Sequence, residues 1–147
     1  VEETLWGDGY VKGKARKIEL LPIGEGLNLE RDAALAFRRM STAAKLAGHK
    51  LRVNTAFRTM DYQKLLYKRF EEQKKTGLKP PPVAKPGYSN HQSGIAVDIN
   101  RALGDDPSTV AYDSPIDLWL GAFAKDFGFK RTVKSEPWHF EHFEGLV

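Results

Sequence analysis

The sequence of 147 residues contains no cysteine, so it can form neither disulfide bonds nor thiolate metal sites. A metal ion would have to be held by nitrogen and oxygen donors. The sequence also lacks an apolar run of the roughly 18 residues that a membrane-spanning helix requires, and we expect no membrane span. It begins at Val1 without methionine, which we interpret as either a removed signal peptide or a trimmed terminus.

A large excess of one charge is missing too. The chain has 23 basic and 19 acidic residues, and its formal net charge of +4 weakly favours a polyanionic surface such as a cell wall or a nucleic acid. This bias does not choose between the two. With 41% hydrophobic residues, a chain of this length fits one domain that buries its own core, and we expect a monomer.

Residues 1–27 differ from the rest of the chain because five glycines interrupt their short apolar runs. We expect an irregular N-terminal arm with one short strand there, and a folded domain over residues 28–147. In that domain, helical spacing of apolar residues predicts helices at 28–47, 61–75 and 115–127. Short apolar or alternating runs predict strands at 51–56, 94–99, 129–131 and 138–143.

Two histidines and one aspartate form the pattern of a catalytic zinc site. Such a zinc ion takes three protein ligands, for which imidazole and carboxylate are suitable, and leaves a fourth position open to water. His91 and Asp98 lie seven residues apart, and a turn at Ser93 and Gly94 would let a loop histidine and a strand aspartate meet. His139 would arrive from the terminal strand. We predict that His91, Asp98 and His139 bind Zn²⁺.

Two glutamates near His139 compete for the role of general base. Glu136, three residues before His139, could take a proton from the attacking water. Glu141 would lie on the same strand face as His139 and could instead orient that ligand. We predict that Glu136 is the base and keep Glu141 as its competitor.

Three more polar residues are candidates for contacts with a substrate. Arg58 follows the strand predicted at 51–56, and from there its guanidinium could stabilise a developing oxyanion. Gln63 and Ser89 are weaker candidates for hydrogen bonds to the substrate or to its terminal carboxylate. Each also has an ordinary interpretation, since arginine and glutamine are common on surfaces and serine is common in turns.

The pattern SxHxxGxAxD, present as residues 89–98, together with ExWH at residues 136–139, resembles the VanY-type D-alanyl-D-alanine carboxypeptidases and related peptidoglycan peptidases. This zinc group shares its fold with the Hedgehog signalling domain. Arg58 and Gln63 look like the arginine motif of the family, and the similarity extends over roughly residues 30–144. Residues 1–27 match no part of that pattern.

The resemblance implies an α+β fold, in which a small single domain packs helices on an antiparallel sheet and the zinc cleft crosses the sheet face. It also implies the three zinc ligands named above, Glu136 as general base and Arg58 as the group that polarises the scissile carbonyl. Members of the family differ in the peptide bond that they cut, so the resemblance leaves that bond open.

These residues favour one function and leave three alternatives. We expect a zinc peptidase that hydrolyses peptidoglycan stem peptides, as a D,D- or L,D-carboxypeptidase that releases terminal D-alanine. An endopeptidase that cuts inside the stem or a cross-bridge fits the same residues. A non-catalytic zinc-containing binding module would need neither Glu136 nor Arg58, and a metal-dependent nuclease draws on little beyond the net charge. We therefore expect peptidoglycan peptides and no nucleic acid as partners, and an extracytoplasmic location in the periplasm, in the cell wall or after secretion.

Overall fold

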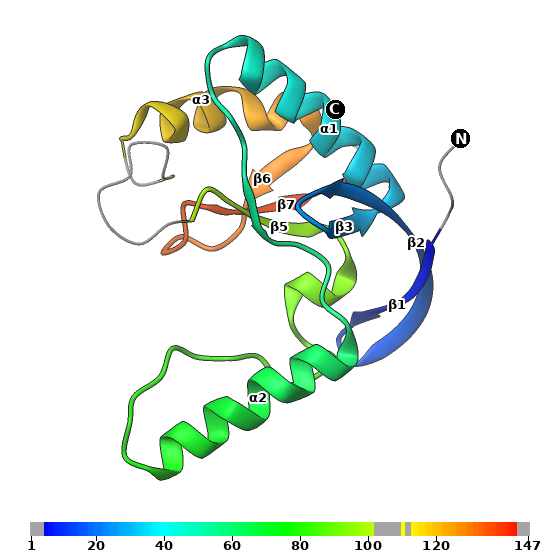
Figure 1. Ribbon diagram of the computed structural model, residues 1–147, viewed down its shortest axis with the longest axis vertical. Coiled ribbons are helices and arrows are strands. Elements are labelled where there is room, and N and C mark those ends of the chain that lie inside the picture. The colour runs from blue at the N-terminus through cyan, green and yellow to red at the C-terminus, as the bar shows by residue number, and fades with distance from the viewer. Residues whose placement is uncertain (1–4, 102–109, 111–112, 144–147) are drawn as a thin grey trace.

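Two antiparallel sheets and three α-helices make up the part of the chain that the structure describes (Figure 1). The structure is a computed structural model, and it describes residues 5–101, 110 and 113–143. The expected α+β fold, a small single domain with helices packed on antiparallel sheet, is confirmed. None of the described helices is both long and apolar enough to cross a membrane.

The glycine-rich N-terminal segment forms a sheet of β1 (Leu5–Val11), β2 (Lys14–Gly24) and β3 (Leu27–Glu30), in that order. The expectation of an irregular arm with one short strand is therefore wrong. Glycine in β1 serves close packing and not irregularity, because a Cβ at Gly7 would lie 2.8 Å from Cδ1 of Leu20 on the neighbouring strand.

The expected boundary between an arm, residues 1–27, and a domain, residues 28–147, falls within β3. This strand continues directly into α1 (Arg31–Leu46), which starts three residues later than predicted because the residues before it pair with β2. The division into arm and domain stays a prediction. Residues 1–4 and 144–147, at its two ends, lie outside the described residues.

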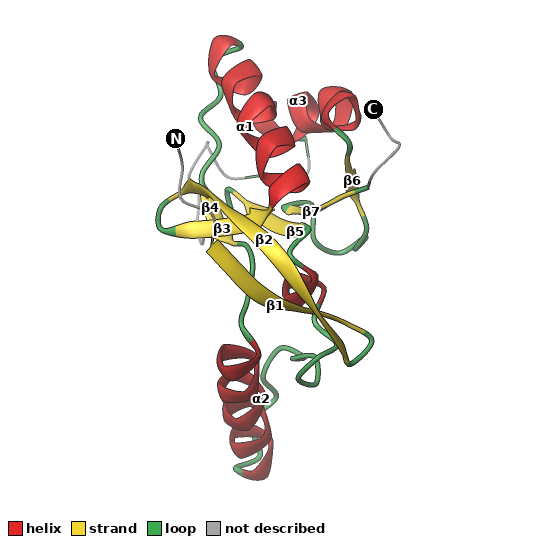
Figure 2. Ribbon diagram, turned by 90° about the vertical axis from the view of Figure 1, so that its right-hand side faces the viewer, coloured by secondary structure: helices red, strands yellow, loops and turns green. Residues whose placement is uncertain are grey.

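The second sheet has the order β4-β5-β7-β6, and each neighbouring pair is antiparallel. Its strands are β4 (Val53–Thr55), β5 (Ala96–Ile99), β6 (Phe129–Arg131) and β7 (His139–His142), close to the four predicted strands. Both α1 and α3 (Pro115–Phe123) lie on one side of this sheet (Figures 1 and 2). The predicted helix 115–127 continues past α3 as a 3₁₀ turn over 124–127.

The hydrophobic core lies between these helices and the second sheet. Phe37 of α1 meets Phe129 of β6 edge to face, with ring centroids 6.4 Å apart. Alternation along β5 sends Val97 and Ile99 into the core and turns Asp98 to the opposite face. A carboxylate is thereby presented on the side of the sheet that the helices leave uncovered.

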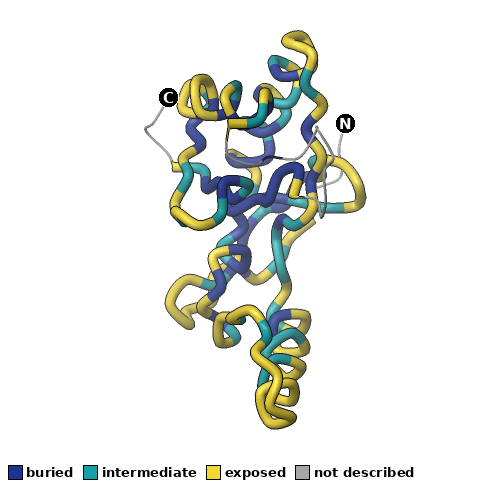
Figure 3. The backbone as a smooth tube through the Cα atoms, turned by 90° about the vertical axis from the view of Figure 1, so that its left-hand side faces the viewer, coloured by how far each residue is buried: buried dark blue, intermediate teal, exposed yellow. Residues whose placement is uncertain are grey.

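The remaining helix, α2 (Met60–Lys75), projects from the body of the molecule (Figures 1 and 3). As predicted, Thr59 caps its start, and the Thr59 hydroxyl accepts a hydrogen bond from the Tyr62 amide at 3.1 Å. Gln63 is the only fully buried residue of α2. The proline-rich loop 78–88 then returns the chain to a 3₁₀ turn, η1 (Asn90–Ser93), beside the second sheet.

Candidate active site

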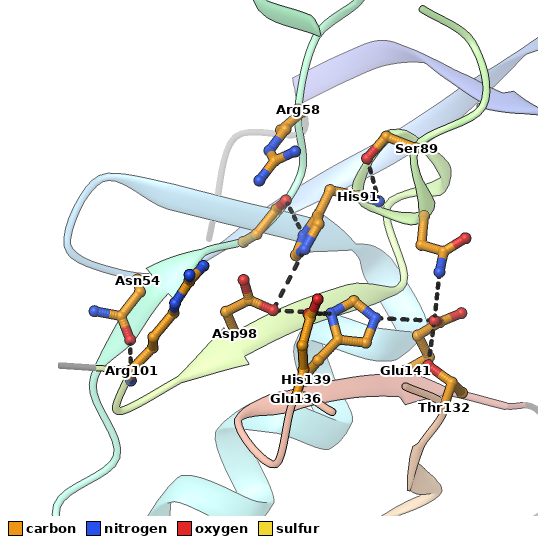
Figure 4. A network of polar contacts seen from close by, with 12 residues as sticks. Asn54, Arg58, Ser89, His91, Asp98, Arg101, Thr132, Glu136, His139 and Glu141 are labelled. Atoms are coloured by element: carbon orange, nitrogen blue, oxygen red, sulfur yellow. Dashed lines mark hydrogen bonds and ion pairs between the residues drawn. The ribbon is translucent and has the colours of Figure 1, made fainter. Parts of the chain in front are cut away.

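The structure brings the three predicted metal ligands together from separate elements. His91 lies on η1, Asp98 on β5 and His139 on β7, and their ligand atoms all lie within 4.8 Å of one another. Asp98 and His139 are direct partners in the β5–β7 ladder, so they share one sheet face. Oδ1 of Asp98 lies 2.8 Å from Nδ1 of His139 and 3.4 Å from Nε2 of His91 (Figure 4).

The turn that delivers His91 has an identifiable local cause. Ser89 begins η1, where its hydroxyl accepts a hydrogen bond from the His91 amide at 3.2 Å. Gly94 ends it with φ of 85°, a conformation that glycine adopts without strain. The carbonyl of Gly94 accepts a hydrogen bond from the Glu30 amide at 2.8 Å, so the N-terminal sheet holds the turn from behind. The expected turn at Ser93 and Gly94 is confirmed.

Each histidine is also held through the ring nitrogen that points away from the cluster. Nδ1 of His91 lies 3.0 Å from the carbonyl oxygen of Ala56, and Nε2 of His139 lies 3.0 Å from Oε2 of Glu141. Because a carbonyl and a carboxylate only accept, the outer nitrogens carry the protons. The inner nitrogens, beside Asp98, are then the ones that face a metal ion, and in the metal-free protein Nδ1 of His139 carries a proton there, 2.8 Å from Oδ1 of Asp98.

Glu141 is the centre of a small buried network behind His139. Its Oε2 also accepts hydrogen bonds from Nδ2 of Asn90 at 3.0 Å and from Oγ1 of Thr132 at 2.5 Å. Burial raises the pKa of Glu141, but the contacts with His139 and Thr132 outweigh burial and lower it below its ordinary value. Of the two roles considered for Glu141, this geometry favours the orientation of His139.

The cluster is strongly coupled when no metal ion is bound. Burial raises the pKa of Asp98, but hydrogen bonds with His139 and His91 hold it well below its ordinary value. Burial lowers the pKa of His139, while hydrogen bonds with Asp98 and Glu141 prevail and raise it to about 9. A cation at Nδ1 of His139, whether a proton or a metal ion, is therefore favoured.

Glu136 and Arg58 line the same cavity as the three ligands, a hollow of about 390 Å³. Oε1 of Glu136 lies 3.9 Å from Nδ1 of His139, and the Glu136 side chain is 40% exposed, whereas Glu141 is buried and does not line the cavity. Nε of Arg58 is buried and has no hydrogen-bond partner among the described residues. Burial lowers the pKa of Arg58.

The two weaker candidates occupy different positions. Ser89 lines the cavity; its oxygen accepts from the His91 amide, and its hydroxyl proton has no acceptor among the described residues. Gln63 lies behind Arg58 and not in the cavity lining. Its Oε1 accepts from Nη1 of Arg58 at 3.3 Å, and its Nε2 donates to the Ala84 carbonyl at 2.8 Å.

The sequence reasoning missed Arg101, which also lines the cavity. Its guanidinium lies over the ring of Trp138, the residue directly before His139. The one available signal was its place at the end of the strand that carries Asp98. That signal is weak, because the stacking partner lies far along the chain.

Comparison with known proteins assigns the chain to a family. Residues 26–145 match the family VanY, D-alanyl-D-alanine carboxypeptidase, and the chain belongs to that family. It is similar to the Bacillus subtilis (strain 168) protein YodJ, a carboxypeptidase by name, with 30% identity over 125 residues. The match covers 78% of this chain and 46% of YodJ, so the chain spans about half the length of that relative.

Solved structures of similar fold include a vancomycin resistance enzyme and a complex of VanYB. The D,D-pentapeptidase VanY of a VanB-type resistance cassette, a glutamate-to-alanine mutant in complex with Zn(II), is 25% identical with a TM-score of 0.66, over 90% of this chain and 82% of that one. VanYB in complex with D-alanine-D-alanine is 26% identical with a TM-score of 0.65, over 85% and 77% of the two chains. DacB from Streptococcus pneumoniae D39, at 22% identity and a TM-score of 0.63, shares the fold over 97% of this chain and 86% of that one.

Proposed function

We propose that this protein is a zinc metallopeptidase that hydrolyses peptidoglycan stem peptides, as a D,D- or L,D-carboxypeptidase that releases terminal D-alanine. The observation that carries the proposal is the meeting of His91, Asp98 and His139 with Glu136 and Arg58 in one cavity. A structural metal site needs neither a base nor an oxyanion donor. The family match and the Zn(II) complex of a similar structure support the same function.

The donor set fits zinc, because it offers two imidazole nitrogens and one carboxylate oxygen and no sulfur. His91, Asp98 and His139 would hold the ion, and the partners of the outer ring nitrogens would keep both rings in place. When bound, Zn²⁺ supplies Lewis acidity, which polarises a carbonyl and lowers the pKa of water.

In this proposal Glu136 moves the proton. Its carboxylate lies at the open side of the cavity and 3.9 Å from Nδ1 of His139, so it is close to the place where water attacks. Glu136 would take a proton from the attacking water and deliver it to the nitrogen of the leaving D-alanine. No other glutamate lines the cavity among the residues that the structure describes.

Arg58 would stabilise the negative charge that develops on the scissile carbonyl oxygen. Its buried Nε has no hydrogen-bond partner among the described residues, so this donor is available to the substrate. Gln63, a sequence-predicted candidate for direct substrate contact, would act through Arg58, since its amide oxygen accepts a hydrogen bond from Nη1 of that arginine. The free hydroxyl proton of Ser89 would be donated to the terminal carboxylate of the substrate.

The proposed partners are peptidoglycan peptides, and the proposed location is extracytoplasmic, as a cell-wall peptidase requires. VanYB is similar to this chain and was solved with D-alanine-D-alanine, which supports a substrate of that kind. We propose a monomer, since the cavity draws its ligands from one chain.

Mass spectrometry of the products from defined muropeptides identifies the peptide bond that the protein cleaves. We expect loss of one D-alanine from a pentapeptide or tetrapeptide stem. Cleavage inside the stem or a cross-bridge would replace the carboxypeptidase by the endopeptidase alternative, and no change in any muropeptide would contradict the proposal.

A further inference from the structure

Arg101 has a fixed backbone although its side chain is exposed. Asn100, with φ of 52°, turns the chain after β5, and its side chain contacts the Arg52 amide at 2.6 Å and the Lys50 carbonyl at 3.0 Å. The amide of Arg101 then donates to Oδ1 of Asn54 at 2.6 Å. These hydrogen bonds fix the backbone from which the Arg101 side chain extends, three residues after Asp98 in the chain.

The Arg101 guanidinium lies over the Trp138 ring in a cation–π contact. Its central carbon lies 4.7 Å from the centroid of the Trp138 ring. A cation–π contact does not consume the N–H donors of a guanidinium, and those donors form the fork that binds a carboxylate. The contact with Trp138 positions the Arg101 guanidinium and leaves its N–H donors available to a ligand.

No acidic side chain in the described part of the chain accepts a hydrogen bond from the Arg101 guanidinium. Arg131 pairs with Asp117 at 2.5 Å and Arg31 pairs with Glu19 at 3.0 Å, whereas Arg101 has no such ion pair among the described residues. Arg58 and Arg101 line one cavity, and besides burial the charge of Arg101 lowers the pKa of Arg58. The cavity also holds the carboxylates of Asp98 and Glu136, but His91 and His139 engage Asp98 and neither carboxylate pairs with Arg101, so Arg101 remains available to an anionic ligand.

The direction in which a substrate peptide would cross the cavity indicates which anionic group would reach Arg101. Figure 4 shows Arg101 and Ser89 on opposite sides of the cluster formed by His91 and Asp98. Under the proposed function, on which this step rests, Ser89 receives the terminal carboxylate of the substrate. A peptide that spans the cavity would then bring the part before the scissile bond to Arg101.

We propose that Arg101 is a specificity-determining residue that binds a carboxylate on the acyl side of the scissile bond. Stem peptides carry a free carboxylate of this kind on D-glutamate, and on diaminopimelate where that residue occurs. In many walls these groups exist as acid or as carboxamide, so Arg101 selects the acid form.

The test measures binding and not turnover, with stem peptides in which a reduced amide replaces the scissile amide. Two peptide pairs differ by acid against carboxamide, one pair at D-glutamate and one at diaminopimelate. With the zinc-loaded protein, calorimetry should show about tenfold tighter binding of the acid in one pair, which identifies the carboxylate. Arg101→Gln should bring that ratio to about one, as loss of a single charged hydrogen-bond partner predicts.

Arg39→Gln is the matched control, because it removes the same charge from the exposed surface of α1 and should keep the ratio. Both peptides of a pair are measured on one protein sample, so a misfolded fraction does not change the ratio of the two affinities. Equal affinities in both pairs, no measurable binding, or a preference that survives Arg101→Gln would each overturn the inference. Hydrolysis of ordinary stem peptides is measured separately. Cleavage without a preference for the acid would support the proposed function and rule out the role of Arg101. A preference for the acid without cleavage would support the role of Arg101 and rule out the proposed function.

Discussion

Each histidine of the candidate site uses one ring nitrogen for orientation and keeps the other for a ligand. The Ala56 carbonyl holds His91, and the Glu141 carboxylate holds His139. Such outer contacts fix the tautomer and the ring plane before a metal ion arrives. The site is thus organised by groups outside the three ligands, as well as by the ligands themselves.

Replacement of Glu136 separates catalysis from metal binding. Because Glu136 is proposed as the base and not as a ligand, Glu136→Ala should retain one bound zinc ion and lose turnover by about 10²–10⁴-fold. Turnover of a stem peptide and the zinc content of the same sample provide the measurement. Glu72→Ala, an exposed acid on α2, should change neither. Unchanged turnover in Glu136→Ala would move the base elsewhere.

Zinc uptake should release a proton. The pKa of His139 in the metal-free protein is raised to about 9, so the ring is protonated at neutral pH and the ion must displace that proton. We expect about one proton released per ion at neutral pH, and an apparent affinity that rises about tenfold per pH unit until the pH reaches the pKa of His139. Calorimetry in two buffers of different protonation enthalpy measures the release, and an affinity independent of pH across neutrality would contradict it.

The sequence was sufficient to predict His91, Asp98 and His139 as a cluster, because motif residues of the right chemistry lay in a loop and two strands. It was not sufficient for Arg101, whose place in the cavity depends on stacking against Trp138. Nor could it show that Gln63 contacts Arg58 and not the cavity, since that depends on how α2 packs.

At the level of elements, the N-terminal sheet supports the turn that carries His91. The β1–β2 turn reaches loop 78–88, where the Gly13 amide donates to the Gly87 carbonyl at 2.9 Å. A Cβ at Gly94 would lie 2.8 Å from Cδ1 of Ile18 on β2. The strands of the first sheet and the turn that carries His91 are therefore packed as one unit.

Gly94→Ala tests this support. Its φ of 85° and its contact with β2 should lower the free energy of unfolding by about 1 kcal/mol or more and weaken zinc binding about tenfold. Denaturant unfolding of the metal-free protein and competition with a chelating dye measure the two effects. Gly77→Ala is the control, since Gly77 has φ of 84° with no atom within 4 Å, and it should lose stability only. Equal zinc affinity in the two variants would refute the supporting role.

The helices and the second sheet were predictable from apolar periodicity, whereas the first sheet was not. The glycine pattern of residues 1–27 predicts breaks, yet Gly7 permits close contact with Leu20, and Gly13 and Gly26 occupy turns at positive φ. A glycine that allows close packing and a glycine that ends a strand look alike in sequence, because the difference lies in the neighbouring strand.

For the whole molecule, the basic charge is concentrated beside the cavity. Residues 60–88, here named the α2 arm, contain seven basic and three acidic residues, a net charge of +4 that equals that of the entire chain. The α2 arm projects from the body, and its Leu66, Val83 and Tyr88 line the cavity (Figure 1). Its charge is thus placed where an anionic wall would approach the site.

Neutralising this arm should weaken attachment to the wall without affecting the chemistry. A variant with Lys68, Lys75 and Lys79 changed to glutamine should bind isolated cell walls several-fold less at low salt, with a shallower salt dependence. Its turnover of a small soluble stem peptide should stay unchanged, because none of the three lines the cavity. Sedimentation of the protein with cell walls over a salt series measures the binding.

The matched control removes three lysines outside the α2 arm, namely Lys45, Lys50 and Lys125. An equal loss of wall binding in the control would show that the total charge, and not its position, governs attachment. A loss of soluble-peptide turnover in the arm variant would show that these lysines serve the reaction itself.

The most direct measurement is the turnover of a D-alanine-terminated stem peptide by metal-free protein as Zn²⁺ is added back. Three ligands that converge on one ion predict activity that rises from near zero and saturates at one equivalent of zinc. Full activity in the metal-free protein, or saturation with no D-alanine released, would contradict the account.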